Sequence, residues 1–143
     1  EVLNGCHPYG EALFNRCVYG VFDPVGYGAD GKYGNEWDMT IWISDRGIES
    51  GRLKDILIHE AAHAYSYLVL RGCVVPDGSS FRELAHKRYG DEEHLADVFV
   101  LYYGGKWTNY DGRENIPIRD RSWMSNMIDY CNLYEEALAT LSS

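Results

Sequence analysis

The sequence has no closely spaced cysteine pair, no internal repeat and no apolar run long enough to span a membrane. Its four cysteines are Cys6, Cys17, Cys73 and Cys131. None forms a Cys-x-x-Cys pair, which argues against a zinc ribbon or a thioredoxin-type redox site. A helix that crosses a bilayer needs roughly 20 apolar residues in a row, so we expect no membrane span.

Basic residues are also scarce. The chain has 13 Lys and Arg against 22 Asp and Glu, and its formal net charge is −9. This balance argues against binding to nucleic acid or to an anionic membrane surface, because both select basic patches. A peptide or protein substrate remains open. The length of 143 residues suits a single domain, residues 1–143, and we expect a monomer.

The even number of cysteines favours two disulfides formed in an oxidising compartment. The alternative is four reduced thiols that are buried as small hydrophobic groups. Of the three possible pairings we favour Cys6–Cys17, which closes a short loop, and Cys73–Cys131, which ties two helix ends together. The chain begins with Glu1, and with these cysteines we expect that a signal peptide has been removed and that the protein is secreted or extracytoplasmic.

The hydrophobic pattern changes from strand-like to helical along the chain. β-branched and aromatic residues predict strands at 16–22 and 39–44, on either side of a segment rich in turn residues. Helical periodicity then dominates. Strands followed by helices indicate an α+β fold, with a small N-terminal β-sheet followed by an active-site helix and C-terminal helices. The predicted helices are 50–71, with Ser50 as N-cap and Gly72 as stop, then about 81–89, 92–103 and 122–141. Ser79 or Ser80 is the expected N-cap of the helix at 81–89 and Gly90 its stop, and Asp91 is the expected N-cap of the helix at 92–103.

The first predicted helix carries the segment KDILIHEAAHAYSYL, residues 54–68. His59 and His63 are four residues apart, so both lie on one helix face and can reach one metal ion at about 2.1 Å. Glu60 is rotated by about 100° from His59 and is poorly placed to be a third ligand. It is well placed to hydrogen-bond a water molecule beside the metal, as the general base of a His-Glu-x-x-His enzyme does.

The alternative for this segment is an ordinary helix whose imidazoles are satisfied without a metal. The apolar neighbours argue against it, because unpaired imidazoles and a carboxylate are costly in a buried helix. We expect that helix to bury one stripe of apolar side chains: Leu53, Ile56, Leu57, Ala61, Ala64 and Leu68. A catalytic zinc ion, Zn2+, then requires a third protein ligand and an open fourth position.

The segment YGDEEHLADVFVLYYGG, residues 89–105, offers several candidates for the third ligand. Glu93 and Asp97 are four residues apart and share one face of an otherwise apolar helix. A buried acidic pair needs a partner, and a metal with its histidines is one. We therefore expect Glu93 to be the ligand and Asp97 to accept the free N–H of a metal-bound imidazole. Glu92 and His94 should meet solvent or cap the helix.

HEAAH followed some thirty residues later by EHLAD resembles the gluzincin metallopeptidases, with their HExxH and ExxxD or ExxxE pattern. The longer EHLADVF is most similar to the compact toxin-like gluzincins, such as the lethal factor catalytic domain and the Pro-Pro endopeptidases, and more distantly to the ImmA/IrrE peptidases. The resemblance covers residues 56–103. It implies a zincin-like fold, Zn2+ as cofactor, Glu93 as ligand and Asp97 as its outer neighbour.

The toxin-like enzymes place an oxyanion-stabilising tyrosine seven residues before the ligand glutamate. That position is His86 here, and Tyr89 lies four residues before Glu93. Both can donate a hydrogen bond to an oxyanion, although an ordinary packing role is the alternative for each.

The resulting hypothesis is a zinc-dependent metalloendopeptidase. Glu60 is its general base, and the substrate main chain pairs with the strand at 39–44. Two other functions remain open. One is a hydrolase of peptidoglycan cross-links, since the aromatic loop at 104–112 is suited to stacking on sugars. The other is a non-catalytic extracellular or phage-associated binding module that carries a zinc site.

Overall fold

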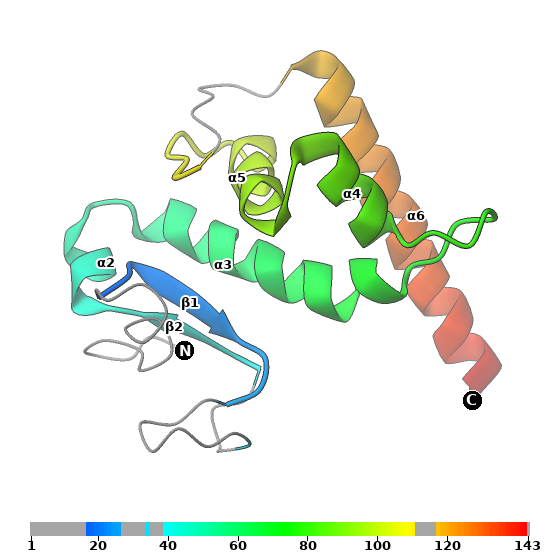
Figure 1. The fold of residues 1–143 in the computed structure, drawn as a ribbon, viewed down its shortest axis with the longest axis horizontal. Coiled ribbons are helices and arrows are strands. Elements are labelled where there is room, and N and C mark those ends of the chain that lie inside the picture. Colours follow the sequence, from blue (N-terminus) through cyan, green and yellow to red (C-terminus); the bar gives the residue numbers. More distant parts are fainter. Residues whose placement is uncertain (1–16, 27–33, 35–38, 111–116, 143) are drawn as a thin grey trace. The chain divides into compact units, whose positions relative to one another are not determined.

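The computed structural model describes residues 17–26, 34, 39–110 and 117–142. Within these residues the fold is α+β, as the sequence predicts, with one two-stranded antiparallel sheet and five α-helices. The chain divides into two compact units, Glu1–Ala64 and Tyr65–Ser143, and the boundary falls inside one continuous helix. Figure 1 shows the elements in chain order. No helix among the described residues is long and apolar enough to cross a membrane.

The first unit contains the sheet. Strand β1, Gly20–Asp23, pairs with strand β2, Thr40–Ile43, and Gly20 lies opposite Ile43 in the register. Both predicted strands are therefore present, although β1 begins later and ends later than the predicted range 16–22. The apolar side of this unit includes Trp42, Ile43 and Ile56, all of which are buried.

A short helix, α2, Asp45–Glu49, follows β2 directly and was missing from the sequence prediction. Ser44 is its N-cap, and the Ser44 side chain accepts a hydrogen bond from the backbone N–H of Gly47. Five residues are too few to show helical periodicity, which explains why the pattern gave no signal. The cap residue was the available cue.

Helix α3, Leu53–Leu68, carries the His-Glu-x-x-His segment and runs across the boundary between the units. It begins later and ends earlier than predicted, because Ser50 is the C-cap of α2 and not the N-cap of α3. A 3-10 turn, η1, Leu70–Gly72, continues the chain to the expected stop. The buried face was also predicted wrongly. Leu57 and Leu68 are exposed, whereas the face formed by Ile56, His59, Glu60, Ala62 and Ser66 is buried.

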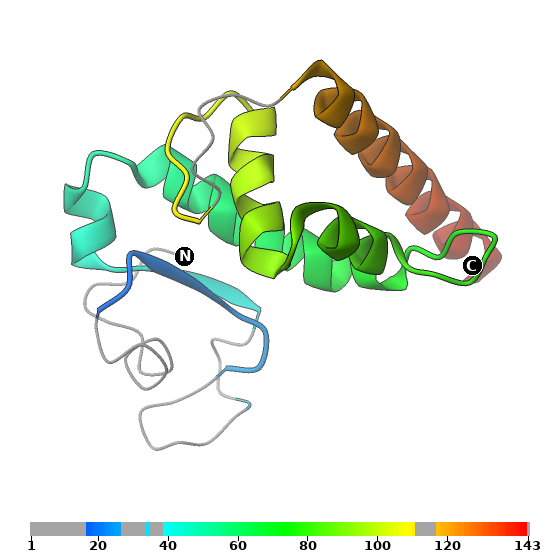
Figure 2. The same cartoon turned by 45° about the horizontal axis from the view of Figure 1, so that its top comes forward.

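The second unit is helical and is built around helix α5, Glu92–Tyr102. Every residue of α5 from Leu95 to Leu101 is buried. Helix α4, Phe81–Tyr89, begins at its N-cap Ser80 and ends at Gly90, and Asp91 is the N-cap of α5. These caps and stops match the predictions from the sequence. Figure 2 shows α4 and α5 from a second direction.

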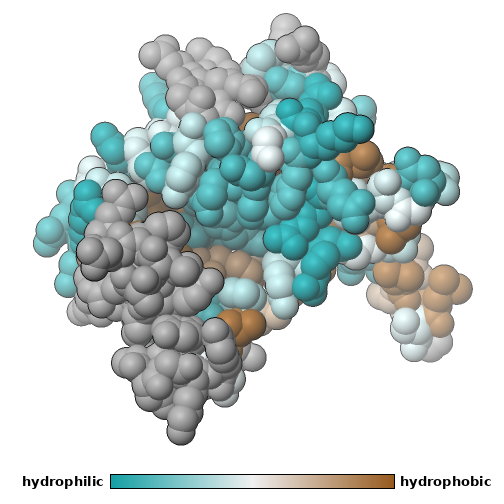
Figure 3. Space-filling view, viewed as in Figure 1, coloured by the Kyte–Doolittle hydropathy of each residue, from teal (hydrophilic) through white to brown (hydrophobic). Residues whose placement is uncertain are grey.

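Helix α6, Ile118–Ser142, starts earlier than predicted and contacts both α4 and α5. The Phe81 ring of α4 contacts Trp123 and Tyr130, and Tyr102 of α5 shares a hydrogen bond of 2.7 Å with Ser125. The last turns of α6 are exposed, including Leu133, Leu138 and Leu141. Brown apolar surface marks this end of the helix in Figure 3.

A disulfide between Cys73 and Cys131 joins the segment after η1 to α6, as the sequence analysis favoured. Both cysteines are fully buried. The other expected pair, Cys6–Cys17, includes a residue that lies outside the described part of the chain.

Tyr65, at the start of the second unit, donates to the Asn132 side chain at 3.0 Å. Burial, with the nearby Tyr103, raises the pKa of the Tyr65 phenol to about 12. The C-terminal end of α3 is thus connected to α6 in two ways. Tyr65 donates a hydrogen bond to Asn132, and Cys73, just beyond the helix, forms the disulfide with Cys131.

Candidate metal centre

The two histidines of α3 point toward one another. Their Nε2 atoms are 3.1 Å apart and their ring centroids are 4.8 Å apart. Two nitrogen ligands at about 2.1 Å from one tetrahedral zinc ion are about 3.4 Å apart. The helical spacing of His59 and His63 therefore holds their nitrogen atoms at a separation close to the one that a shared ion needs.

Glu93 completes a group that can hold a metal ion. His59 and His63 from α3 and Glu93 from α5 each offer one ligand atom, and these atoms all lie within 4.8 Å of one another. His59 is buried and the other two are partly buried. The structure thus brings together the three residues that the sequence analysis selected as ligands.

Contacts within the second unit join α5 to the C-terminal part of α3. The Tyr65 ring meets the Phe99 ring edge to face at 5.9 Å, and the Ser66 hydroxyl donates to Glu92 at 3.0 Å. Both Tyr65 and Ser66 stand in the turn of α3 that follows His63. The Ser66–Glu92 hydrogen bond thus joins the first turn of α5 to the last turns of α3.

The set of two imidazoles and one carboxylate fits a metal that keeps an open coordination position. Three protein ligands with a free fourth site are typical of catalytic zinc. The same donor set also occurs in iron(II) enzymes, as the two-histidine, one-carboxylate triad. The residues therefore define a site for a divalent transition metal, and the ligand types alone do not select zinc.

Glu60 lies beside the histidines and is only 6% exposed. Strand β1 passes close to it at Gly20. A Cβ atom added at Gly20 would lie 3.0 Å from Cγ and 3.2 Å from Oε1 of Glu60, and 3.1 Å from Cγ2 of Ile56. Such distances are shorter than ordinary contacts, so the absent side chain of Gly20 leaves the space that the Glu60 side chain occupies. Sequence analysis did not identify Gly20.

Asp97 is fully buried in the middle of α5, as its apolar neighbours predicted. Its Oδ2 atom accepts a hydrogen bond from the backbone N–H of Tyr110, in the loop that follows α5. Asp97 therefore fixes that loop to the helix. Its expected role in orienting a metal-bound imidazole stays a prediction.

Glu92 was expected to meet solvent or to cap the helix, and this expectation was wrong. Its carboxylate is 24% exposed and accepts three hydrogen bonds on one oxygen, Oε2. The donors are Ser66 of α3 and Arg82 and His86 of α4. Arg82 and His86 are four residues apart and share a helix face, which was the only signal of this cluster in the sequence.

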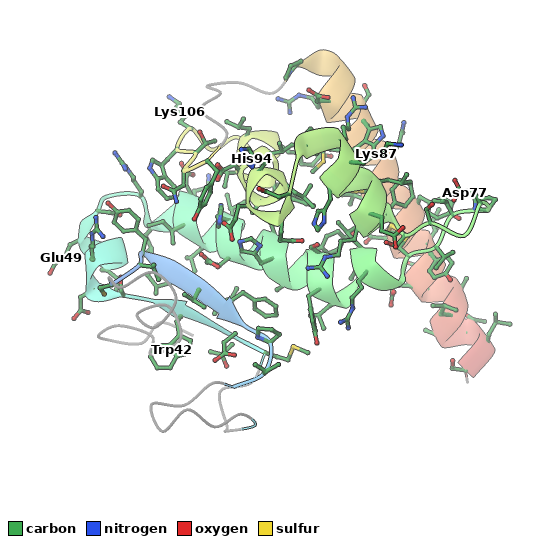
Figure 4. The ribbon with its side chains drawn as sticks, in the orientation of Figure 1. Trp42, Glu49, Asp77, Lys87, His94 and Lys106 are labelled. Carbon is green, nitrogen blue, oxygen red and sulfur yellow. A yellow bond between two sulfur atoms is a disulfide. The ribbon has the colours of Figure 1, made fainter. Side chains whose placement is uncertain are left out.

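His94 belongs to the cap of α5. Its backbone N–H and its Nδ1 atom both lie within 2.9 Å of Oδ1 of Asp91. The hydrogen bond from the His94 backbone N–H, with that from its side chain, lowers the pKa of Asp91. Figure 4 shows His94 on α5 and Lys87 on the neighbouring α4. His94 thus has the capping environment that the sequence analysis expected.

The two candidates for oxyanion stabilisation differ in their surroundings. Tyr89 is buried, and its ring meets that of Trp123 of α6 edge to face at 5.8 Å. This packing is the ordinary structural role that was the alternative for Tyr89. His86 is partly exposed, and its Nε2 atom is 2.6 Å from Glu92. A hydrogen bond from His86 to an oxyanion would therefore have to come from Nδ1.

No family model matches the chain, and neither the curated proteins nor the solved structures contain one that is significantly similar to it.

Proposed function

We propose that the protein is a zinc-dependent metallopeptidase that cleaves peptide bonds within polypeptides. The observation that carries this proposal is the grouping of His59, His63 and Glu93, with a buried carboxylate, Glu60, next to the first histidine. A metal ligand set alone would fit many proteins. A neighbouring carboxylate that is not part of the ligand group is the additional feature that hydrolysis by an activated water requires.

Each residue of the site has one role in the proposed reaction. His59, His63 and Glu93 would hold the ion through three protein ligands, the number typical of catalytic zinc. Bound Zn2+ would lower the pKa of a water molecule beside it toward about 7 and polarise the substrate carbonyl. Glu60 accepts the proton from the attacking water and delivers it to the leaving amine. His86 and Tyr89 are the candidates for donation to the developing oxyanion.

The position of β1 changes the expected path of the substrate. The described strand that contacts Glu60 is β1, through Gly20, whereas the sequence analysis assigned substrate pairing to the strand at 39–44. Among the described residues the sheet has only these two strands, with β2 on one edge of β1. We propose that a substrate main chain pairs with β1, since this strand lies beside the general base.

The disulfide between Cys73 and Cys131 supports an extracytoplasmic site of action, because structural disulfides persist in oxidising compartments.

A second substrate class, peptidoglycan, is supported by one observation. Tyr103 and Tyr110 flank the loop after α5 and are 54% and 41% exposed. Exposed aromatic rings suit stacking on sugars, which keeps cleavage of peptidoglycan cross-links as the second candidate.

The decisive experiment compares the wild-type protein with Glu60→Gln, using unfolded protein and purified cell walls as parallel substrates. We expect Glu60→Gln to retain the metal and the fold and to lose hydrolysis by about 10² or more, the scale of a general acid–base group. A metal-loaded wild-type protein that cleaves neither substrate would favour the non-catalytic binding module. Undiminished turnover in Glu60→Gln would show that another group activates the water.

A further inference from the structure

Glu92 stands next to the third ligand in the sequence, and its carboxylate accepts hydrogen bonds from three side chains. Ser66 Oγ lies at 3.0 Å, Arg82 Nε at 3.0 Å and His86 Nε2 at 2.6 Å from its Oε2 atom. All four residues belong to the unit Tyr65–Ser143. The cluster therefore joins α3, α4 and α5 within one compact unit.

The hydrogen bond from Ser66 gives this cluster its relation to the metal site. Ser66 is three residues after His63 on α3, so the two side chains occupy the same helix face one turn apart. Glu92 and Glu93 are consecutive residues in the first turn of α5, with Cα atoms about 3.8 Å apart. Ser66 thus bonds the residue that precedes Glu93, a member of the candidate metal-binding group.

Charged hydrogen bonds and the helix N-terminus both favour a fixed position for the Glu92 carboxylate. Hydrogen bonds to a charged carboxylate are about twice as strong as those between neutral groups. Arg82 offsets the negative charge of Glu92, and the N-terminus of α5 favours acidic groups in its first turn. Glu92 is partly shielded from solvent, with 24% of its side chain exposed, which limits screening by water and salt.

We propose that Glu92 is a positioning residue that locks the first turn of α5 against α3 and so presents Glu93 to the metal. This inference rests on the proposed metal site. It gives Glu92 a role different from the exposed or capping position that the sequence analysis expected. Glu92 itself does not touch the ion in this account, and its effect passes through Glu93.

The first test measures zinc affinity by competition with a chelator. Glu92→Gln should bind zinc about 10-fold more weakly than the wild type, the lower end of the range for groups that orient a ligand. Ser66→Ala should produce a smaller change in the same direction. Glu83→Gln is the matched control, since Glu83 is an exposed acid on α4 and makes no side-chain contact in the cluster; its affinity should equal that of the wild type.

A double-mutant cycle separates positioning from a general loss of stability. In a Glu93→Ala background the two histidines retain weak zinc binding, and Glu92→Gln should then have no further effect. An equal weakening in both backgrounds would overturn the inference, as would an unchanged affinity of Glu92→Gln in the wild-type background. Absence of zinc binding by the wild type would instead refute the proposed function, so the two failures are distinguishable.

Discussion

Helices α3 and α5 both supply the candidate metal centre, but they do so in different ways. On α3 the spacing of His59 and His63 is sufficient, because one regular helix places their Nε2 atoms 3.1 Å apart. On α5 spacing alone does not identify the ligand. Five acidic or histidine side chains lie between residues 91 and 97, and each has different surroundings.

The surroundings of these α5 side chains come from tertiary contacts. Asp91 and His94 cap the helix, Glu92 binds α3 and α4, and Asp97 is buried and holds the following loop. Glu93 alone of the five joins the two histidines in a metal-binding group. A motif within one helix can thus be read from the sequence, whereas a ligand from a second helix depends on how the helices pack.

The largest expected effect tests which side chain of α5 is the metal ligand. Glu93→Ala should reduce zinc affinity to that of the two histidines alone, because it removes a direct ligand. Asp97→Asn should weaken affinity about 10–100-fold if Asp97 orients an imidazole. His94→Ala, the control on the capping side of the helix, should leave affinity unchanged. A chelator titration in which Asp97→Asn or His94→Ala is the most damaging change would overturn the assignment of Glu93.

The second effect concerns the fastening of α3 to α6. Cys73 and Cys131 are separated by 58 residues, and closing a loop of that length in the unfolded chain corresponds to about 4 kcal/mol of stability. The double replacement Cys73→Ala, Cys131→Ala should lower the free energy of unfolding by up to this amount in denaturant titrations without reductant. A loss close to zero would mean that the packing of α6 alone holds the C-terminal end of α3.

The smallest expected effect tests the contact between β1 and the candidate general base, Glu60. Gly20→Ala introduces a methyl group against Glu60 and Ile56, and overpacking of this kind costs about 1–3 kcal/mol. We expect lower stability and slower hydrolysis with zinc binding retained. Gly72→Ala is the matched control, because a Cβ atom at Gly72 meets nothing within 4 Å. Equal behaviour of the two variants would show that β1 does not constrain the general base.

The comparison of the two helices also explains what the sequence could and could not predict. The caps Ser80 and Asp91 and the stop Gly90 act through neighbouring residues, and the corresponding helix ends were predicted correctly. The buried face of α3 was predicted wrongly because apolar side chains occur all around this helix. Leu57 and Leu68 are exposed, while the polar residues His59 and Glu60 are buried.

Helix α2 was missed because a single capped turn shows no hydrophobic period. Two other features were missed because their causes lie far away in the sequence. The role of Gly20 depends on a contact with α3, forty residues later. The cluster around Glu92 joins three helices, and only the Arg82 and His86 spacing hinted at it. Packing between elements, and not local preference, determines each of these.

Metal analysis of the purified protein tests the central claim most directly. Elemental analysis, combined with thermal unfolding in the presence and absence of added metal, should show one zinc ion per chain and a higher melting temperature in zinc. His63→Ala should abolish both the bound zinc and the shift, because it removes a ligand. Protein that contains no zinc and whose melting temperature does not respond to it would contradict the account, and stoichiometric iron would contradict its choice of metal.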